Sequence, residues 1–505
     1  MVLSGYLQGQ NQKKYRVEPL NMKECILRAL KYNLELEIES YNPKIKEFDL
    51  NMARSEFDPA FTTSLTIGEL ESERAIGASD SSGQPTTLFL QTATRIIQTK
   101  IGVGKRNSWG GTMGIYYGID YSKQLEKKLS SRNPSWESSF TFQISQPLLR
   151  NLGISVNLAS IHIAQNEVNR SVYGFKNKII QVLSRVQLAY WNLVNAIANY
   201  DLQKKSLEQA ENLYKITMAR IKAGSLAAAD ILEAETNVAS KQDSLILAEK
   251  MIYDAEDVLK QLINPTDLNY YKHVRLMPTE RYDFKKFQVD FEKTLHEALK
   301  LRPDLRAAKI GLKTAGISVE KNKNQLLPKL DLSAELGLGG FGESLNKSWD
   351  QVKDTDFFSW TVQLNLEIPL GNRLARNQYL KSLAQKKQAL AQYKLLESSV
   401  LTQVREAVRA LLTAMRRTET AQKTRKLAER QLANEENKFR AGIIALFQVQ
   451  TTEQKLTAAR INESNALLGY QRALVQLGQA KGAILEEIKR YGVDLKLPEV
   501  QKKQY

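Results

Sequence analysis

The sequence predicts a mainly α-helical fold with transmembrane β-strands, arranged as an internal tandem duplication. Three observations predict it: features that recur in both halves, very long segments without proline, and stretches in which apolar and polar residues alternate. Hydrophobic residues make up 42% of the 505 residues, enough for a substantial core. No stretch approaches the ~18 uninterrupted apolar residues of a spanning helix, so strands are the elements predicted to cross a membrane.

The two halves repeat the same features in the same order. Two of the repeated features share one offset of 269 (298 − 29 and 328 − 59). The matching segments are Ala29-Leu30-Lys31 with Ala298-Leu299-Lys300, Pro59 with Pro328, Gln146-Pro147-Leu148 with Ile368-Pro369-Leu370, and Lys222-Ala223-Gly224 with Arg440-Ala441-Gly442. The predicted organisation is an N-terminal extension (1–19), a first repeat (20–263), a linker (264–290), a second repeat (291–490) and a C-terminal tail (491–505).

Each repeat is predicted to contain a very long helix. No proline occurs between Pro147 and Pro265 or between Pro369 and Pro498, and both segments are rich in residues that favour helix. Each helix is expected to run about 70 residues, or ~105 Å. Apolar residues recur at coiled-coil spacing in both, at Ile179, Val182, Val186, Ala189 and Leu193 and at Leu401, Val404, Val408, Leu411 and Met415. Such helices must pack beside equally long partners, within the chain or in other subunits.

Between the helices, strict alternation predicts barrel strands at about 60–146 and 330–369. The predicted lipid-facing residues are Phe140, Phe142, Ile144, Val362, Leu364, Leu366 and Ile368. A half-buried sheet of a soluble protein also alternates, but these strands have the length of bilayer-crossing strands and aromatic residues near their ends. We count two strands in the second half and two to four in the first. That is too few to close a wide barrel, so closure requires several subunits.

The remaining chemistry predicts neither an enzyme nor a cofactor. Cys25 is the only cysteine, the three histidines have no metal-site spacing, and the net charge of +17 is spread among acidic residues, which favours solvated helix faces over a nucleic-acid site. Gly337, Gly339 and Gly342 satisfy GxGxxG after a strand, but we expect no helix after them to hold a pyrophosphate. They are predicted to form a flexible loop at a barrel rim.

These features together resemble the TolC-like outer-membrane efflux family over about residues 20 to 490. The resemblance implies a homotrimer that forms one membrane barrel, typically of 12 strands and thus about four per protomer, continued by an α-helical barrel across the periplasm. It implies a passive export duct of a tripartite efflux or type I secretion system, which opens at its periplasmic tip when docked to an adaptor (membrane fusion protein) and an inner-membrane transporter. Residues 78–135 depart from the family, because they hold extra strand-like material.

The resemblance also places a periplasmic entrance just beyond the helix-turn glycines Gly224 and Gly442. Asp230 and Glu233 share a helix face there, and threefold symmetry would turn them into acidic rings that favour cations. A solvated helix face is the alternative for these two residues. The second half has less acidic pore-lining candidates at its turn, namely Leu446, Phe447, Gln448 and Thr451.

The competing interpretation is a soluble periplasmic coiled-coil adaptor or scaffold. It draws on residues 1–6, which lack the apolar core of a secretory signal. Two predicted helical hairpins and strands with wholly aliphatic faces favour the duct. The expected location is therefore the outer membrane, with an extension into the periplasm and contact with outer-membrane lipid.

Overall fold

The computed structural model describes residues 16–79, 81–125, 133–223, 229–263, 268–286 and 288–486. The chain divides into two compact units, and both halves of the sequence contribute to each. We call them the helical unit (Met1–Ile45, Asn169–Lys309 and Ala391–Tyr505) and the sheet unit (Lys46–Val168 and Ile310–Leu390). The predicted C-terminal tail and Gly224 lie outside the described residues.

Each half runs through two helices, a block of strands, a very long helix and a shorter returning helix. The described helices are α1 (Met22–Tyr32), α2 (Leu34–Arg54), η1 (Ser55–Phe57), α3 (Ile154–Asn157), α4 (Ala159–Lys222), α5 (Ala229–Ile263), α6 (Leu268–His273), α7 (Phe291–Leu301), α8 (Pro303–Asn324), α9 (Leu345–Asp354), α10 (Arg373–Arg440) and α11 (Leu446–Lys481). The described strands are β1 (Arg16–Leu20), β2 (Ala60–Ser79), β3 (Pro85–Arg106), β4 (Thr112–Gln124), β5 (Ser135–Pro147), β6 (Val274–Pro278), β7 (Lys329–Gly342) and β8 (Phe357–Glu367). The long helices α4 and α10 have 64 and 68 residues, close to the predicted 70.

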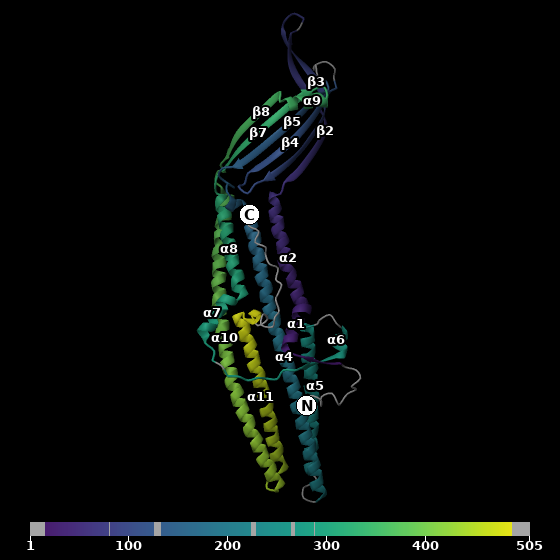
Figure 1. The fold of residues 1–505 in the computed structure, drawn as a ribbon, viewed down its shortest axis with the longest axis vertical. Helices are drawn as coiled ribbons and strands as arrows, with labels where there is room; N and C mark the ends of the chain where they lie inside the picture. Colours follow the sequence, from purple (N-terminus) through teal and green to yellow (C-terminus); the bar gives the residue numbers. More distant parts are fainter. Residues whose placement is uncertain are drawn as a thin grey trace. The chain divides into compact units, whose positions relative to one another are not determined.

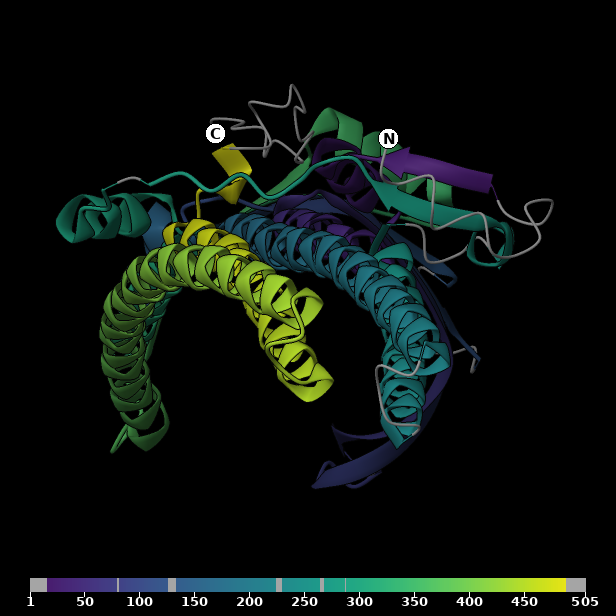
Figure 2. The same ribbon diagram turned by 90° about the horizontal axis from the view of Figure 1, so that it is seen from below.

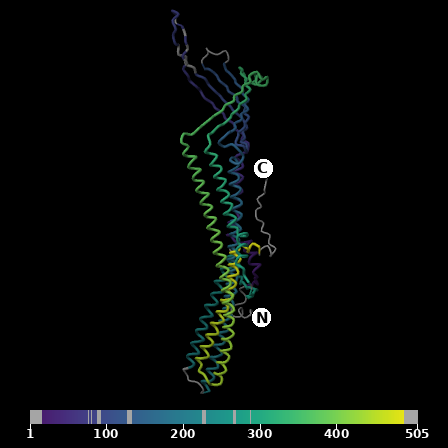
Figure 3. The backbone as a smooth tube through the Cα atoms, turned by 90° about the vertical axis from the view of Figure 1, so that its left-hand side faces the viewer, coloured from purple at the N-terminus to yellow at the C-terminus, as the bar shows by residue number. Residues whose placement is uncertain are grey.

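In the helical unit the predicted apolar seams are buried. Ile179, Val182, Val186 and Leu193 are 0% exposed in one cluster, and Val404 and Leu411 are 0% exposed in a second, while Leu401 is half-buried. The helices that cover these seams belong to the same chain. Figures 2 and 3 show α10 and α11 running side by side in this unit.

Polar contacts fix the neighbours of α11 within the helical unit. Thr418 on α10 donates to the Ala466 carbonyl of α11 at 3.1 Å, and Arg472 of α11 donates to Asn192 Oδ1 of α4 at 2.7 Å. The returning helix α11 therefore contacts the long helices of both halves. The predicted linker is also structured, because β6 pairs in parallel with β1, a strand that overlaps the end of the predicted N-terminal extension.

Among the described residues, the sheet unit contains one antiparallel sheet of six strands in the order β2-β3-β4-β5-β7-β8 (Figure 1). The second half contributes the two strands expected. The first half contributes four, because the extra strand-like material predicted within residues 78–135 forms much of β3 and β4. The sheet therefore has more strands than the four per protomer that the family resemblance implies.

The expectation of a loop without a helix at the GxGxxG match was wrong. Segment 337–342 belongs to β7, and α9 begins directly after it. Ser344 is its N-cap, since its hydroxyl accepts a hydrogen bond from the Lys347 backbone N–H at 3.4 Å. A Cβ at Gly340 would lie 1.9 Å from the Ser348 carbonyl oxygen. These glycines therefore let a short helix pack closely against the sheet.

Candidate functional site

The sheet has one aliphatic and one polar face. Because directly paired residues point to the same side, one register row across all six strands is apolar: Phe61, Val103, Ile115, Phe142, Leu336 and Trp360. These side chains are 36% to 68% exposed in the chain. The adjacent row on the opposite face consists of Thr62, Gly102, Tyr116, Thr141, Gly337 and Ser359.

Six of the seven predicted lipid-facing residues lie on the aliphatic face of the sheet. The seventh, Ile368, directly follows the end of β8. The exposed fractions are 38%, 36% and 36% for Phe140, Phe142 and Ile144. The residues of the last strand and the position after it are more exposed, at 59% for Val362, 61% for Leu364, 61% for Leu366 and 59% for Ile368. Such a large exposed apolar surface requires an apolar partner, which water cannot supply.

On the polar face, one aromatic ring covers a group of glycines. A Cβ at Gly102 would lie 2.2 Å from Tyr116 Cδ1, and a Cβ at Gly114 would lie 2.6 Å from the Tyr116 hydroxyl oxygen. The Lys100 ammonium stands 4.5 Å from the centroid of the same ring. The glycines therefore give the ring room to lie against the strands β3 and β4.

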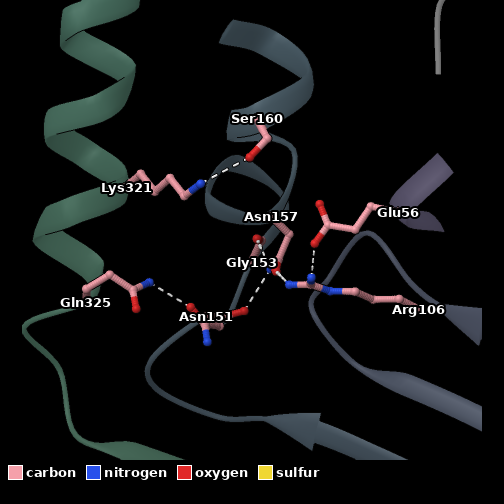
Figure 4. Close-up of polar contacts among 8 residues, drawn as sticks. All are labelled: Glu56, Arg106, Asn151, Gly153, Asn157, Ser160, Lys321 and Gln325. Carbon is pink, nitrogen blue, oxygen red and sulfur yellow. Dashed lines mark hydrogen bonds and ion pairs between the residues drawn. The ribbon is translucent and has the colours of Figure 1, made fainter. Parts of the chain in front are cut away.

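A polar cluster joins the turn between β3 and β4 to the segments that flank the sheet (Figure 4). Arg106, the last residue of β3, forms an ion pair with Glu56 of η1 and donates to Asn157 Oδ1 at 2.9 Å. The Asn157 amide donates to the carbonyls of Asn151 and Gly153 at 2.7 and 2.8 Å. The end of β3 is thus bonded both to the segment before β2 and to the segment after β5.

The turn itself is fitted closely into this cluster. Gly110 has φ +99°, and a Cβ there would lie 2.3 Å from the Asn151 carbonyl oxygen. The Gly153 N–H donates to the Trp109 carbonyl at 3.2 Å. Further along, Gln325 of the second half donates to Asn151 Oδ1 at 2.7 Å, and Lys321 of α8 donates to Ser160 Oγ of α4 at 3.1 Å (Figure 4). Sequence reasoning missed this cluster because its members are separated by up to about 270 positions (325 − 56).

At the far ends of the long helices, the two halves touch through Arg220. Its guanidinium lies 4.5 Å from the centroid of the Phe439 ring and donates to the carbonyls of Phe439 and Arg440 at 3.4 and 3.5 Å. This contact joins the last turn of α4 to the last turn of α10. The helix dipole favours a basic residue in the last turn of a helix, but the contact between Arg220 and Phe439 was not predicted from the sequence.

The entrance residues predicted from the sequence divide into two groups. Asp230 and Glu233 lie in the first turns of α5 and are half-buried. In the second half Phe447 is 65% exposed, Gln448 is exposed and Thr451 is half-buried. Gly442 has φ +77°, as a helix-ending glycine does, and is exposed.

Leu446 departs from the prediction. It is 3% exposed and packs with Leu432, Phe439, Val449 and Leu456 in the core of the hairpin formed by α10 and α11. A side chain buried within its own chain cannot line a pore. The physical reason is position: the first residue of α11 faces the helix it returns along, whereas the next one, Phe447, faces solvent.

A buried carboxylate lies near the same end of the helical unit. Glu453 of α11 is 5% exposed, and its Oε1 has no hydrogen-bond partner. Burial raises the pKa of Glu453; Lys241 opposes this rise, while Glu436 adds to it. A buried carboxylate is costly when ionised, so Glu453 favours its protonated form more than an exposed glutamate does.

The fold defines the class of protein. An antiparallel sheet with an aliphatic face, followed along the chain by helices of more than 60 residues, is the arrangement of outer-membrane channels of the TolC type. The family model described as "Outer membrane efflux protein" matches residues 109–265 and 294–483, and the chain belongs to this family. Membership confirms the outer-membrane location predicted from the sequence.

Individual relatives are distant. The chain is 25% identical over 330 residues to the pyoverdine export outer membrane protein OpmQ of Pseudomonas aeruginosa, covering 64% of this chain and 66% of that protein. It is 24% identical over 317 residues to the outer membrane protein TolC of Vibrio cholerae, covering 61% and 68%. The chain thus matches just under two thirds of the length of OpmQ.

Solved structures share the fold over nearly the whole chain. The Campylobacter jejuni CmeC outer membrane channel has 18% identity and a TM-score of 0.65, covering 94% of this chain and 90% of that one. The Vibrio cholerae outer membrane protein VceC has 16% identity and a TM-score of 0.62, covering 91% and 96%. Among these proteins, OpmQ is named as an export protein and CmeC as a channel, and none of the four is named as an enzyme. In the part of the chain that the structure describes, no helix is long and apolar enough to cross a membrane.

Proposed function

We propose that three copies of this chain form a passive export duct, with the sheets closing into one barrel in the outer membrane and the long helices forming a tunnel into the periplasm. The observation that carries the proposal is the exposed aliphatic row that crosses every described strand of the sheet, with a polar row on the opposite face. One face fits lipid and the other fits a water-filled lumen. A single six-stranded sheet leaves two edges unpaired, which several copies can close.

The tandem duplication supports the same proposal. The family model matches the chain in two separate segments, one in each of the predicted repeats, 20–263 and 291–490. Only the last two residues of the first matched segment, 264 and 265, lie outside the first repeat. Each half supplies one long helix and one returning helix, so three copies would place six similar hairpins around an axis. A helical tunnel built this way needs no further chain.

Export through such a duct needs energy from elsewhere. OpmQ is named as a pyoverdine export protein, and we propose for this chain export alone, without a named cargo. We propose that a periplasmic adaptor docks at the tip of the helices and that an inner-membrane transporter powers transport. The aliphatic face would contact outer-membrane lipid through Phe140, Phe142, Ile144, Val362, Leu364, Leu366 and Ile368.

At the periplasmic entrance, we propose that Asp230 and Glu233 form acidic rings. Both are half-buried at the start of α5, three residues apart and so on one helix face. Carboxylate rings in a pore attract cations and repel anions. Phe447, Gln448 and Thr451 would provide the less charged part of the entrance, while Gly224 and Gly442 mark the turns.

Planar-bilayer recording tests the duct and the rings together. We expect the purified trimer to give discrete channels with cation preference, and Asp230→Asn with Glu233→Gln to lose that preference while keeping the channels. Glu235→Gln, on the same helix but exposed, is the matched control and should keep the preference. Channels with unchanged selectivity in the double variant would remove the rings and keep the duct.

The alternative remains a soluble coiled-coil adaptor or scaffold. It predicts a protein that stays monodisperse without detergent and gives no channels. The exposed fractions of the aliphatic face argue against it, because a soluble scaffold would leave that face in water. Sedimentation with and without detergent separates the two: a detergent-free monomer would overturn the duct.

A further inference from the structure

Resting on the proposed trimeric duct, we infer that its membrane barrel has 18 strands, three copies of six, with β3 and β4 as full members of the wall. Family resemblance implies 12. The alternative is a 12-stranded barrel in which β2 pairs directly with β5 and the hairpin of β3 and β4 lies outside the wall. Three independent observations favour the wider barrel.

The first observation is the uniform height of the sheet. The strands β4, β5, β7 and β8 have 13, 13, 14 and 11 residues. The longer strand β2 pairs along its whole length with residues 85–104 of β3, but β4 pairs only with residues 94–106 of β3. The wall is therefore of even height across all six strands, about the length that crosses a bilayer at a tilt. Only residues 71–79 and 85–93 extend past it as a two-stranded ribbon (Figure 1).

The second observation is that the inserted strands keep the two faces in register. Val103 of β3 and Ile115 of β4 stand in the aliphatic row between Phe61 and Phe142. On the opposite face the middle of these strands carries polar residues, glycines and one tyrosine, namely Gln98, Lys100, Gly102, Gly114, Tyr116, Gly118 and Asp120. A hairpin outside the barrel would place that lysine and aspartate in lipid, at a cost of several kcal/mol. Within the wall they face the lumen.

The third observation is the anchoring of the inserted turn. The polar cluster bonds Arg106 at the end of β3 to Glu56 before β2 and to Asn157 after β5. The turn glycine Gly110 lies against the Asn151 carbonyl, since a Cβ added at this glycine would lie only 2.3 Å from the carbonyl oxygen. The turn thus fills the space between the segments that enter and leave the strand block. A hairpin displaced from the wall would lose all these bonds.

A second copy of the same chain is the partner that fits the sheet edges. Within the described residues, β2 and β8 are the edge strands, and every residue of β8 is exposed. Because all neighbours are antiparallel and six is even, β2 and β8 run in opposite directions. The β8 edge of one copy can therefore pair with the β2 edge of the next and continue the antiparallel pattern. In lipid an unpaired edge is not tolerated, so the ring must close.

The strand number sets the width of the lumen. With strands about 4.8 Å apart and tilted by about 40°, a barrel of 18 strands has a backbone diameter of about 36 Å, and one of 12 strands about 24 Å. The cross-section of the membrane segment is then about twofold larger than in the 12-stranded form. Such a barrel admits cargo wider than a small molecule, provided that the tip opens equally far.

Disulfide mapping in outer membranes tests the strand order. Cys25, the only native cysteine, is 0% exposed and can remain in place. The pairs Thr66→Cys with Gln98→Cys and Thr112→Cys with Ser145→Cys join strands that are directly paired here, β2 with β3 and β4 with β5. Thr62→Cys with Thr141→Cys probes the 12-stranded form, because these residues lie three strands or about 14 Å apart in this sheet, beyond disulfide reach. Each single cysteine variant is the matched control.

A fourth set joins neighbouring copies: Ser64→Cys in β2 with Thr361→Cys, Gln363→Cys or Asn365→Cys in β8. We expect disulfides in the two paired sets, none between positions 62 and 141, and covalent trimers from one member of the fourth set. A disulfide between positions 62 and 141, with none between 112 and 145, would overturn the 18-stranded barrel. Covalent trimers in the same experiment would still support the trimeric duct. If no pair of the fourth set gives covalent trimers, the trimer proposed for the duct is wrong.

Discussion

The Lys260 ammonium lies 2.9 Å from Glu256 Oε1, and both side chains are almost fully buried, at 1% and 2% exposure. The carboxylate also accepts from the Leu276 N–H at 2.9 Å and from Arg275 at 3.0 Å, while the ammonium donates to the Val274 carbonyl at 2.6 Å. The pair therefore attaches β6 to α5 with nearly all its hydrogen-bonding groups satisfied. It is a structural pair and lies in no proposed lumen.

Removing one partner of this pair should be costly. We expect Lys260→Met to destabilise the protein by about 3–5 kcal/mol, because it leaves a buried carboxylate whose main neutralising charge is gone. Thermal unfolding of the detergent-solubilised protein measures the change. The double variant with Glu256→Gln should recover part of the loss. Lys250→Met, which breaks a solvent-exposed pair with Asp254, is the control and should change little.

The pH dependence of stability should report on Glu453. Its pKa is raised in the folded protein, so its contribution favours folding below the pKa of an unfolded glutamate and is lost as the pH rises through the folded pKa. We therefore expect Glu453→Gln to have a higher Tm than the wild type at neutral pH and nearly the same Tm near pH 4. Equal Tm values at neutral pH would contradict a pKa of Glu453 that burial raises in the folded protein.

The pH dependence of Glu35 should have the opposite sign. Hydrogen bonds from Arg185 and Lys178 lower the pKa of Glu35 to about 2. Its contribution is thus present above the pKa of an unfolded glutamate and is lost as the pH falls toward 2. Glu35→Gln should lower the Tm slightly at neutral pH, because the carboxylate is 41% exposed and screened by water. A larger effect at acidic than at neutral pH would contradict this sign.

The contact between Arg220 and Phe439 should hold the tip of the duct. Removing it with Arg220→Ala costs about 1 kcal/mol per protomer, a typical cation–π energy. The loss is about 3 kcal/mol over the three copies, which should shift the equilibrium between open and closed tip on the order of 100-fold toward the open state. Single-channel recording measures this. Arg220→Lys keeps the charge but loses the planar stacking on Phe439, so its open probability should lie between those of the wild type and Arg220→Ala. Unchanged gating in Arg220→Ala would show that the tip is held by other contacts.

The turn between β3 and β4 should be needed for barrel assembly. Gly110→Ala places a Cβ 2.3 Å from the Asn151 carbonyl in a residue with φ +99°, so both a clash and backbone strain result. We expect the fraction of folded trimer, read from its mobility on a gel without heating, to fall severalfold. Gly371→Ala has φ +88° with no atom within 4 Å and isolates the strain. Equal losses in the two variants would mean that the fit of the turn is unimportant.

Much of the fold followed from local pattern. The alternation of residues such as Val362 and Leu364 with polar neighbours is a backbone property of strands, and a proline-free segment rich in helix formers can hardly fold otherwise. The buried seam of Ile179 and Val186 was predicted for the same reason. These signals lie within a few residues of each other, so the sequence alone determined the helices, the strands, the two faces of the sheet and, through them, the class of protein.

Only the tertiary structure decided how these elements combine. Four features depend on which distant segments meet: the order of the six strands, the packing of α9 on Gly340, the burial of Leu446 and the hydrogen bonds of Glu256 and Lys260 to β6. Periodicity gives the face on which a side chain lies but not what covers that face. The free energy of covering it comes from contacts between residues far apart in the chain, and a local pattern carries no record of those contacts.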